Sequence, residues 1–247
     1  MDFGIKGRKA IVCASSQGLG RACALALARE GVDVLINGRD AGKVDTAAQT
    51  IRAAAPGVTV ATVVGSVTDA TCREAMLKAC PAPDIVVNNA GGPPPGDFRD
   101  WTRETWIAAF DANLYSAVEL IRMSLDGMMA RGFGRIVNIT SSSARVPIPV
   151  LRLSNAMRAG LINFSLGLVP QTSPKGVTIN NMLPGPFDTD RIRKSKELSQ
   201  SVKNPVAGRL GDPDEFGAAC AFLCSRQAAY ITGQNIMLDG GLNPGNF

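Results

Sequence analysis

Residues 9–38 decide the fold, and they read KAIVCASSQGLGRACALALAREGVDVLING. The apolar run at 9–14 predicts a short buried strand, and a second apolar run at 32–36 predicts another. Between them, residues 18–30 follow a helical pattern that ends at Gly31, a residue suited to the position after a helix. A strand, a helix and a second strand in this order predict a right-handed βαβ unit with parallel strands.

The same alternation continues to the end of the chain. We expect further strands at 58–64, 84–88, 135–140, 177–182 and 235–238, and helices ending at 55 and spanning 69–80, 104–131, 151–168 and 214–225. Alternation without a linker, repeat or low-complexity tract predicts a single α/β domain over residues 1–247. The expected architecture is a three-layer αβα Rossmann fold with a doubly wound parallel sheet of about seven strands. Ligands of such folds bind at the carboxyl ends of the strands.

The composition excludes several classes of site. The chain of 247 residues carries a net charge of +5, is 45% hydrophobic and contains no histidine. Ser-His-Asp and Cys-His nucleophile systems are therefore excluded, and we expect no metal site. The six cysteines form no C-x-x-C pair, which indicates free thiols in a reducing compartment.

No segment has the pattern of a targeting or membrane-spanning sequence. The N-terminus lacks a basic region followed by an apolar stretch, and no apolar run is long enough to span a bilayer. We therefore expect a cytoplasmic protein with no membrane partner. The basic residues are scattered apart from a cluster at 191–196, which we interpret as a solvated helix face and not as a nucleic-acid site.

A set of polar and glycine-containing motifs stands at or near the expected strand ends, except for Asn113, which falls in the helix expected at 104–131. The motifs are Asn88-Asn89-Ala90-Gly91, Asn113, Asn138-Ile139-Thr140-Ser141, Pro184-Gly185-Pro186, Thr189, Ile231-Thr232-Gly233-Gln234 and Asp239-Gly240-Gly241. In this order the set resembles the short-chain dehydrogenase/reductase family, most closely its 3-oxoacyl-acyl-carrier-protein-reductase-like branch, over essentially the whole chain. The resemblance implies an oxidoreductase that uses a nicotinamide cofactor, acts on a small-molecule carbonyl or acyl substrate and assembles as a homotetramer.

The first βα turn and the end of the second strand carry the cofactor prediction. Gly18 and Gly20 follow a strand and open a helix, which lets backbone N–H groups approach a pyrophosphate, although a purely structural tight turn would look the same. Ala14 stands where the family has its first glycine. Arg39 stands where an acidic residue would hold the ribose of NAD, and a guanidinium suits the 2′-phosphate of NADP. We therefore expect NADP(H) to be favoured over NAD(H).

The resemblance implies roles for further residues around the cofactor. The expected cofactor-binding residues are Ser15, Ser16, Gln17, Gly18, Leu19, Gly20, Arg39, Ser66, Val67, Asn88, Ala90, Gly91, Arg158, Pro184, Gly185 and Thr189. Thr189 would hold the nicotinamide carboxamide. Ser66 stands where the family usually has an aspartate that accepts from the adenine amino group, and a hydroxyl is a weaker acceptor there.

The catalytic Tyr-x-x-x-Lys of the family is replaced. Residues 154–158 read Ser-Asn-Ala-Met-Arg, so Ser154 stands at the tyrosine position and Arg158 at the lysine position. With Ser141 and Asn113, the family's other two catalytic positions, they are the expected catalytic residues. An alkyl hydroxyl is far less acidic than a phenol of pKa about 10, and a guanidinium keeps its charge without relaying a proton. The gap beside Ser154 could hold a water that supplies the proton.

Three functions are compatible with these residues. The first is an NADP-linked carbonyl reductase, and the second is a cofactor-binding protein without redox turnover, either a sensor or a partner in a hetero-oligomer. The third is a non-redox enzyme similar to the halohydrin dehalogenases, which have arginine in place of the lysine but keep the tyrosine. Specificity would depend on residues 145–150 and 187–204, which mix apolar and basic side chains.

Overall fold

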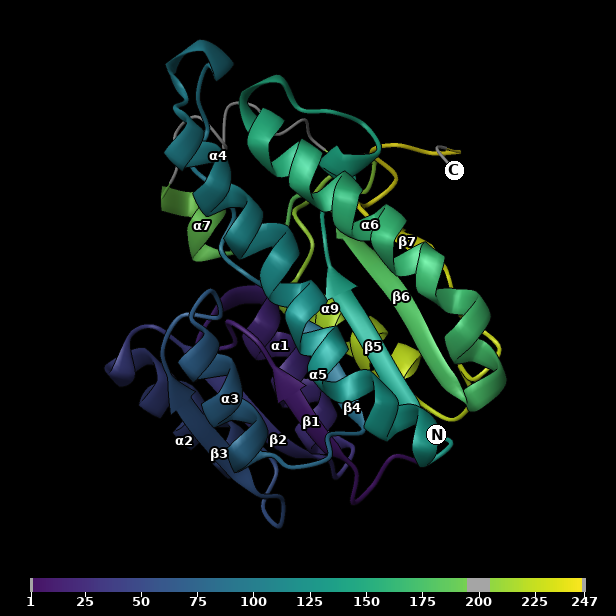
Figure 1. Cartoon of the computed structure of the whole chain (residues 1–247). Coiled ribbons are helices and arrows are strands. Elements are labelled where there is room, and N and C mark those ends of the chain that lie inside the picture. The colour runs from purple at the N-terminus through teal and green to yellow at the C-terminus, as the bar shows by residue number, and fades with distance from the viewer. Residues whose placement is uncertain (1, 195–204, 246–247) are drawn as a thin grey trace.

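The computed structural model describes residues 2–194 and 205–245 (Figure 1). Its sheet has seven parallel strands in the order β3-β2-β1-β4-β5-β6-β7. The strands are β1 (Lys9–Val12), β2 (Asp33–Gly38), β3 (Val60–Val64), β4 (Ile85–Asn88), β5 (Gly134–Ile139), β6 (Val177–Pro184) and β7 (Asn235–Leu238). The helices are α1 (Gly18–Arg29), α2 (Ala41–Ala54), α3 (Ala70–Ala79), α4 (Arg103–Phe110), α5 (Ser116–Ala130), α6 (Arg152–Thr172), α7 (Asp190–Lys194) and α9 (Pro213–Cys224). The predicted α/β Rossmann architecture is confirmed.

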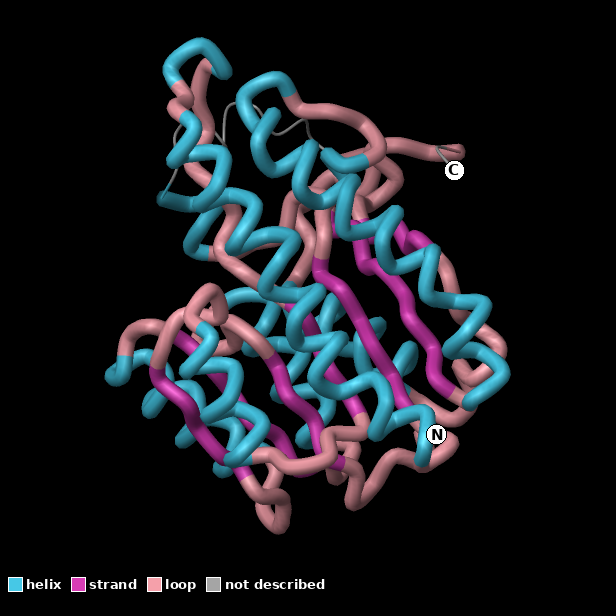
Figure 2. The backbone as a smooth tube through the Cα atoms, in the orientation of Figure 1, coloured by secondary structure: helices cyan, strands magenta, loops and turns pink. Residues whose placement is uncertain are grey.

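Helices cover both faces of the sheet, as Figures 1 and 2 show. Successive side chains of a strand point to opposite faces, so Ala10 and Val12 pack with α1, α2 and α9, whereas Ile11 packs with α3 and α5. The strands are buried on both sides and therefore read as nearly continuous apolar runs. The strand order reverses between β1 and β4, which opens a crevice at the carboxyl ends of these strands.

Tight helix packing supports this crevice from one face. A Cβ on Gly217 of α9 would lie 2.5 Å from the carbonyl oxygen of Ala22 in α1, so only glycine permits the two helices to approach this closely. The six cysteines are buried free thiols. Among the described residues, no helix is both long and apolar enough to cross a bilayer.

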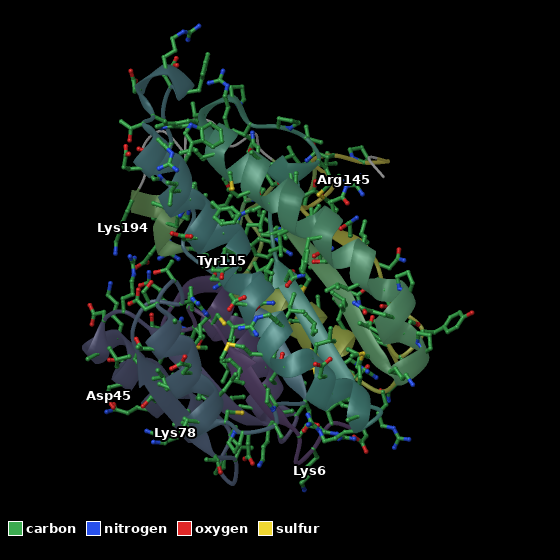
Figure 3. The ribbon with its side chains drawn as sticks, viewed as in Figure 1. Lys6, Asp45, Lys78, Tyr115, Arg145 and Lys194 are labelled. Atoms are coloured by element: carbon green, nitrogen blue, oxygen red, sulfur yellow. The ribbon has the colours of Figure 1, made fainter. Side chains whose placement is uncertain are left out.

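The long helix expected at 104–131 is divided by a π-helical turn at Asp111–Tyr115. Such turns insert one extra residue into a helix and often occur at functional sites. Here the turn brings Asn113 into the interior, where only 4% of it is exposed. Tyr115, labelled in Figure 3, is 40% exposed and stacks on Phe110 at a ring distance of 5.7 Å. Its hydroxyl therefore does not replace the missing catalytic tyrosine.

Residues 195–204 lie outside the described residues. They include part of the basic cluster at 191–196 and most of the segment at 187–204 that we expected to govern specificity. The described part of that segment comprises the residues that follow β6, up to the end of α7 at Lys194.

Candidate active site

The turn after β1 is where we expect a pyrophosphate to bind. Residue 14, expected in the strand, lies in this turn, and Ala14 has φ 44° while Gly18 has φ 58°. A left-handed conformation is open to glycine but strains a residue with a Cβ. A Cβ on Gly20 would lie 2.6 Å from the carbonyl oxygen of Ala14, so glycine is required there. Gln17 caps α1 without a side-chain hydrogen bond, which leaves the first N–H groups of the helix open to a phosphate.

Hydrogen bonds with Asn37 and Asn89 hold this turn in place. Ser15 Oγ donates to Val12 O at 2.6 Å and accepts from Asn37 N at 3.0 Å. Asn37 Oδ1 accepts from Ala14 N, and Asn89 Nδ2 donates to Ala14 O at 3.1 Å. Because Ser15 is fully buried and its hydroxyl is bonded within the turn, its side chain supports the turn and is not available to a cofactor. Our sequence reasoning missed both asparagines as part of the site, although Asn89 belongs to a motif that we quoted.

The end of β2 offers donors for a phosphate. A Cβ on Gly38 would lie 2.7 Å from Ser16 Oγ, so Ser16 lies against the end of this strand. Arg39 follows Gly38 and is exposed, and within the described ranges it pairs with no carboxylate. The adjacent Asp40 caps α2 by accepting from Lys43 N at 3.1 Å. A hydroxyl and a free guanidinium fit the 2′-phosphate of NADP, which agrees with the sequence argument.

The expected adenine contact is occupied by a local turn. Ser66 Oγ lies 2.7 Å from Thr68 Oγ1 and accepts from Thr68 N at 3.3 Å. The neighbouring Val67 is buried against the core. The Ser66 hydroxyl is therefore already engaged with Thr68, and its contact with an adenine amino group stays a prediction.

The remaining cofactor positions lie around the same crevice. Thr189 reaches the glycine turn, since a Cβ on Gly18 would lie 3.8 Å from its methyl group. Gly185 packs against Asp239, where an added Cβ would come within 2.5 Å of the aspartate Cβ. Leu19, the second residue of α1, instead packs its side chain against the core. Pro184 ends β6 next to Gly185, and Gln17 is exposed at the mouth of the turn.

A ladder of asparagine side chains, which we did not predict, joins β4, β5, β6 and β7. Asn88 Nδ2 donates to Asn138 Oδ1 at 2.8 Å, and Asn138 Nδ2 donates to Asn181 Oδ1 at 2.9 Å. Asn181 Nδ2 then donates to Asn235 Oδ1 at 3.0 Å. The four residues occupy equivalent positions on β4, β5, β6 and β7, because the parallel register pairs each with the next. The ladder orients Asn88, whose own Oδ1 has no partner in the described chain.

A cavity of about 10 Å³ lies next to Asn88. Asn113, Ala90 and Arg158 also line it. Asn113 Nδ2 donates to Gly91 O at 3.3 Å, whereas its Oδ1 has no partner among the described residues. A buried water needs roughly 10–15 Å³ and two to four polar partners. The size and the two unpaired amide oxygens therefore fit one water beside the expected catalytic residues.

Arg158 and Ser154 form a hydrogen-bonded pair in α6. Arg158 Nε donates to Ser154 Oγ at 3.2 Å, Nη1 donates to Ile139 O at 2.6 Å, and Nη2 donates to Ala90 O at 3.4 Å. Arg158 is 8% exposed and Ser154 is 5% exposed. Burial, together with the smaller effect of the positive charge of Arg191, lowers the pKa of Arg158 to about 10. The serine hydroxyl accepts from a cation and so keeps its own hydrogen available to donate.

Ser141 lies apart from this pair. Its Oγ is 2.8 Å from Ser143 Oγ and accepts from Ser143 N at 3.1 Å. Ser141 is half-buried, and no direct bond joins it to Ser154 within the described residues. Asn113 and Arg158 thus line one cavity, and Ser154 is joined to it through its bond with Arg158. Ser141 caps the short helix Ser142–Ala144, which precedes Arg145 (Figure 3).

A backbone hydrogen bond joins two loops, one that follows β4 and one that precedes α6. Gly96 N donates to Val150 O at 3.0 Å, which connects the loop after β4 with the loop before α6. Arg152 lies over the ring of Phe98 at 5.4 Å, and Arg145 is exposed. Both arginines are exposed and neither lines the cavity next to Asn88, so they do not replace the missing acid there.

The sequence and the structure both match known proteins. Residues 13–243 match a family model described as enoyl-(acyl carrier protein) reductase. The NADPH-dependent reductase BacG of Bacillus subtilis is 31% identical over 251 residues, covering 95% of this chain and 97% of the relative. The 3-oxoacyl-[acyl-carrier-protein] reductase FabG of Vibrio harveyi is 31% identical over 244 residues, covering 96% of this chain and 98% of the relative.

A solved structure shares the whole architecture. It is the L-sorbose reductase from Gluconobacter frateurii complexed with NADPH and L-sorbose, with a TM-score of 0.91, 28% sequence identity and 99% coverage of both chains. The match covers the described crevice as well as the sheet.

Proposed function

The chain belongs to the short-chain dehydrogenase/reductase family and is similar to its 3-oxoacyl-acyl-carrier-protein reductases, and on this basis we propose that it is an NADP(H)-dependent carbonyl reductase. The observation that carries the proposal is the Ser154–Arg158 pair beside a water-sized cavity at the carboxyl ends of β4 and β5. The proposed domain spans residues 1–247. A cytoplasmic location stays a prediction from the sequence.

NADP(H) is proposed over NAD(H) because of Arg39 and Ser16. Both offer donors at the end of β2, and the nearest carboxylate, Asp40, is engaged in capping α2. Relatives described as NADPH-dependent or solved with NADPH support the same choice. The bound cofactor would supply a hydride, and the chain's own residues would supply orientation and hydrogen bonds.

Ser154 and Arg158 would stabilise the substrate oxygen. The Ser154 hydroxyl, polarised by the guanidinium of Arg158, would donate a hydrogen bond to the carbonyl oxygen of the substrate. The proton would come from water in the cavity lined by Asn113, since neither side chain is an adequate acid. Because the tyrosine acid is absent, we expect turnover to be roughly 10²–10⁴-fold slower than in an enzyme that has a general acid in place.

The same pair favours a second reaction, reduction of a C=C bond conjugated to a carbonyl. Hydride would then add to the β-carbon, the electron pair would move onto the carbonyl oxygen, and water would protonate the α-carbon. The enolate formed is a weaker base than an alkoxide, so hydrogen bonds from Ser154 and Arg158 could stabilise it without a strong acid. The description of the matching family model agrees with this chemistry.

One set of measurements tests both reactions. NADPH and NADH are titrated against the protein and followed by nicotinamide fluorescence, and then a β-keto ester, a diketone and a conjugated enone are tested with NADPH. We expect NADPH to bind more tightly than NADH and at least one substrate to give reduced product. NADPH binding without turnover of any substrate would favour the alternative function, a sensor or a partner in a hetero-oligomer. If neither nucleotide binds, the oxidoreductase function is rejected.

We also propose a homotetramer. Large apolar side chains that are 37–40% exposed gather along α4, the π turn and α6: Trp106, Ile107, Phe110, Tyr115 and Phe164. Tyr230, in the C-terminal stretch expected to join subunits, is fully exposed in the single chain. A light-scattering mass near 25.9 kDa would contradict the tetramer.

A further inference from the structure

Two guanidinium groups from different helices reach the loop that follows β4. Arg158 of α6 donates to Ala90 O, and Arg191 of α7 donates from Nη1 to Gly92 O at 3.1 Å and from Nη2 to Pro93 O at 3.3 Å. Arg158 is almost fully buried. Arg191 is exposed as a residue, yet desolvation of its guanidinium lowers its pKa.

Neither guanidinium has a carboxylate partner in the described part of the chain. The acids nearest to Arg191 in sequence are already paired, Asp188 with Arg193 at 2.7 Å and Asp190 with Lys194 at 2.9 Å. Backbone carbonyls satisfy N–H groups but do not neutralise a cation. The positive charge of Arg191 also lowers the pKa of Arg158, so the two cations disfavour each other as they stand.

Both groups keep donors for a ligand. A guanidinium has five N–H bonds, of which Arg158 uses one on each nitrogen and Arg191 uses one on each terminal nitrogen. An anion near both would accept from the remaining N–H groups and would relieve the repulsion. Planar guanidinium groups match the geometry of carboxylate and phosphate oxygens.

We propose that Arg191 and Arg158 together bind an oxyanion of a ligand, a carboxylate or a phosphate, beside the loop at residues 90–93. This inference rests on the proposed function, because the anion belongs to one of the two molecules that the reaction needs. It is either the carboxylate of an oxo-acid substrate or the pyrophosphate of NADPH. Arg191 comes two residues after Thr189, the expected carboxamide contact, so the substrate carboxylate next to the nicotinamide is the source that we expect.

The test uses two ketones that differ in one charge, acetoacetate and methyl acetoacetate. Calorimetry measures the affinity of each for the protein saturated with NADP⁺, and fluorescence measures the affinity of NADPH for the free protein. Arg191→Gln should weaken acetoacetate binding about 10- to 100-fold and leave the neutral ester unchanged. Arg193→Gln is the matched control, because it removes the same charge from the same helix but from a guanidinium that pairs with Asp188.

A second variant keeps both charges. A Cβ on Gly92 would lie 2.6 Å from Arg191 Nη2, so Gly92→Ala should displace the guanidinium and give a smaller loss in the same direction. A loss of NADPH affinity in Arg191→Gln, with acetoacetate unaffected, would identify the anion as the cofactor phosphate. Unchanged affinity for both ligands would overturn the proposal.

The proposed function and this inference can fail separately. If the wild-type protein binds no NADPH, the reductase is rejected, and acetoacetate is then titrated against the free protein and the Arg191→Gln variant. A difference between these two proteins would still support the oxyanion site, and equal affinities would reject it.

Discussion

The asparagine ladder offers the sharpest test of how the sheet supports the site. Asn138 is fully buried, accepts from Asn88 and donates to Asn181 and to Ser165 Oγ at 2.8 Å. In Asn138→Ala, Asn88 Nδ2 and Asn181 Oδ1 both lose their partner, whereas Ser165 keeps its bond to Leu161 O. Each unsatisfied buried group destabilises the fold by about 1–3 kcal/mol, so the free energy of unfolding should fall by about 2–6 kcal/mol.

Urea unfolding followed by circular dichroism measures this loss, with Asn235→Ala as the matched variant. Asn235 is only partly buried, so water can replace its bond to Asn181, and we expect that variant to lose at most about 1 kcal/mol. Asn138→Asp should be worse than Asn138→Ala, since a buried carboxylate can accept from Asn88 but cannot donate to Asn181. Equal losses in Asn138→Ala and Asn235→Ala, or a loss below about 1 kcal/mol in Asn138→Ala, would refute the reasoning.

Three further predictions concern the cofactor and catalytic positions. Ala14→Gly should raise the free energy of unfolding, measured in urea, by about 1 kcal/mol. The φ of 44° strains alanine in the folded state, and relief of this strain outweighs the stability lost because glycine gives the unfolded chain more entropy. An unchanged or lower stability would contradict this prediction. Arg39→Asp should lower NADPH affinity by about tenfold or more and raise that of NADH, as fluorescence titration would reveal, whereas an unaltered preference would show that Arg39 does not meet the 2′-phosphate. Ser154→Tyr combined with Arg158→Lys should raise ketone reduction by roughly 10²–10⁴-fold in steady-state kinetics, and no gain would mean that the proton is delivered elsewhere.

Local patterns in the sequence were sufficient for the architecture. Apolar runs of strand length alternate with helical patterns, and this order allows few arrangements other than a parallel sheet covered on both faces. The long helix was predicted too simply, since a π turn inserts a residue where Asn113 enters the cavity. Hydrophobic periodicity does not reveal such a turn, because the flanking helices keep their own apolar faces.

The residue types at the site were also readable from the sequence. Arg39 at the end of the second strand and the replacement at 154–158 follow from position along the chain alone. What these side chains contact did not follow. Ser15 and Ser66 have hydroxyls that suit a ligand, yet the structure uses them in local hydrogen bonds.

The sequence by itself determined the fold class, the glycine-rich turn and the absence of the usual acid, because each depends on the order of residues within one or two neighbouring elements. Only the tertiary structure decided that Asn88, Asn138, Asn181 and Asn235 form one ladder. It also decided that Arg158 binds backbone carbonyls and, among the described residues, no carboxylate. The ladder contacts join residues that are 43 to 54 positions apart, and the strand register brings them within hydrogen-bond distance. The physical reason is that burial and pairing of polar groups depend on what the whole fold places around them.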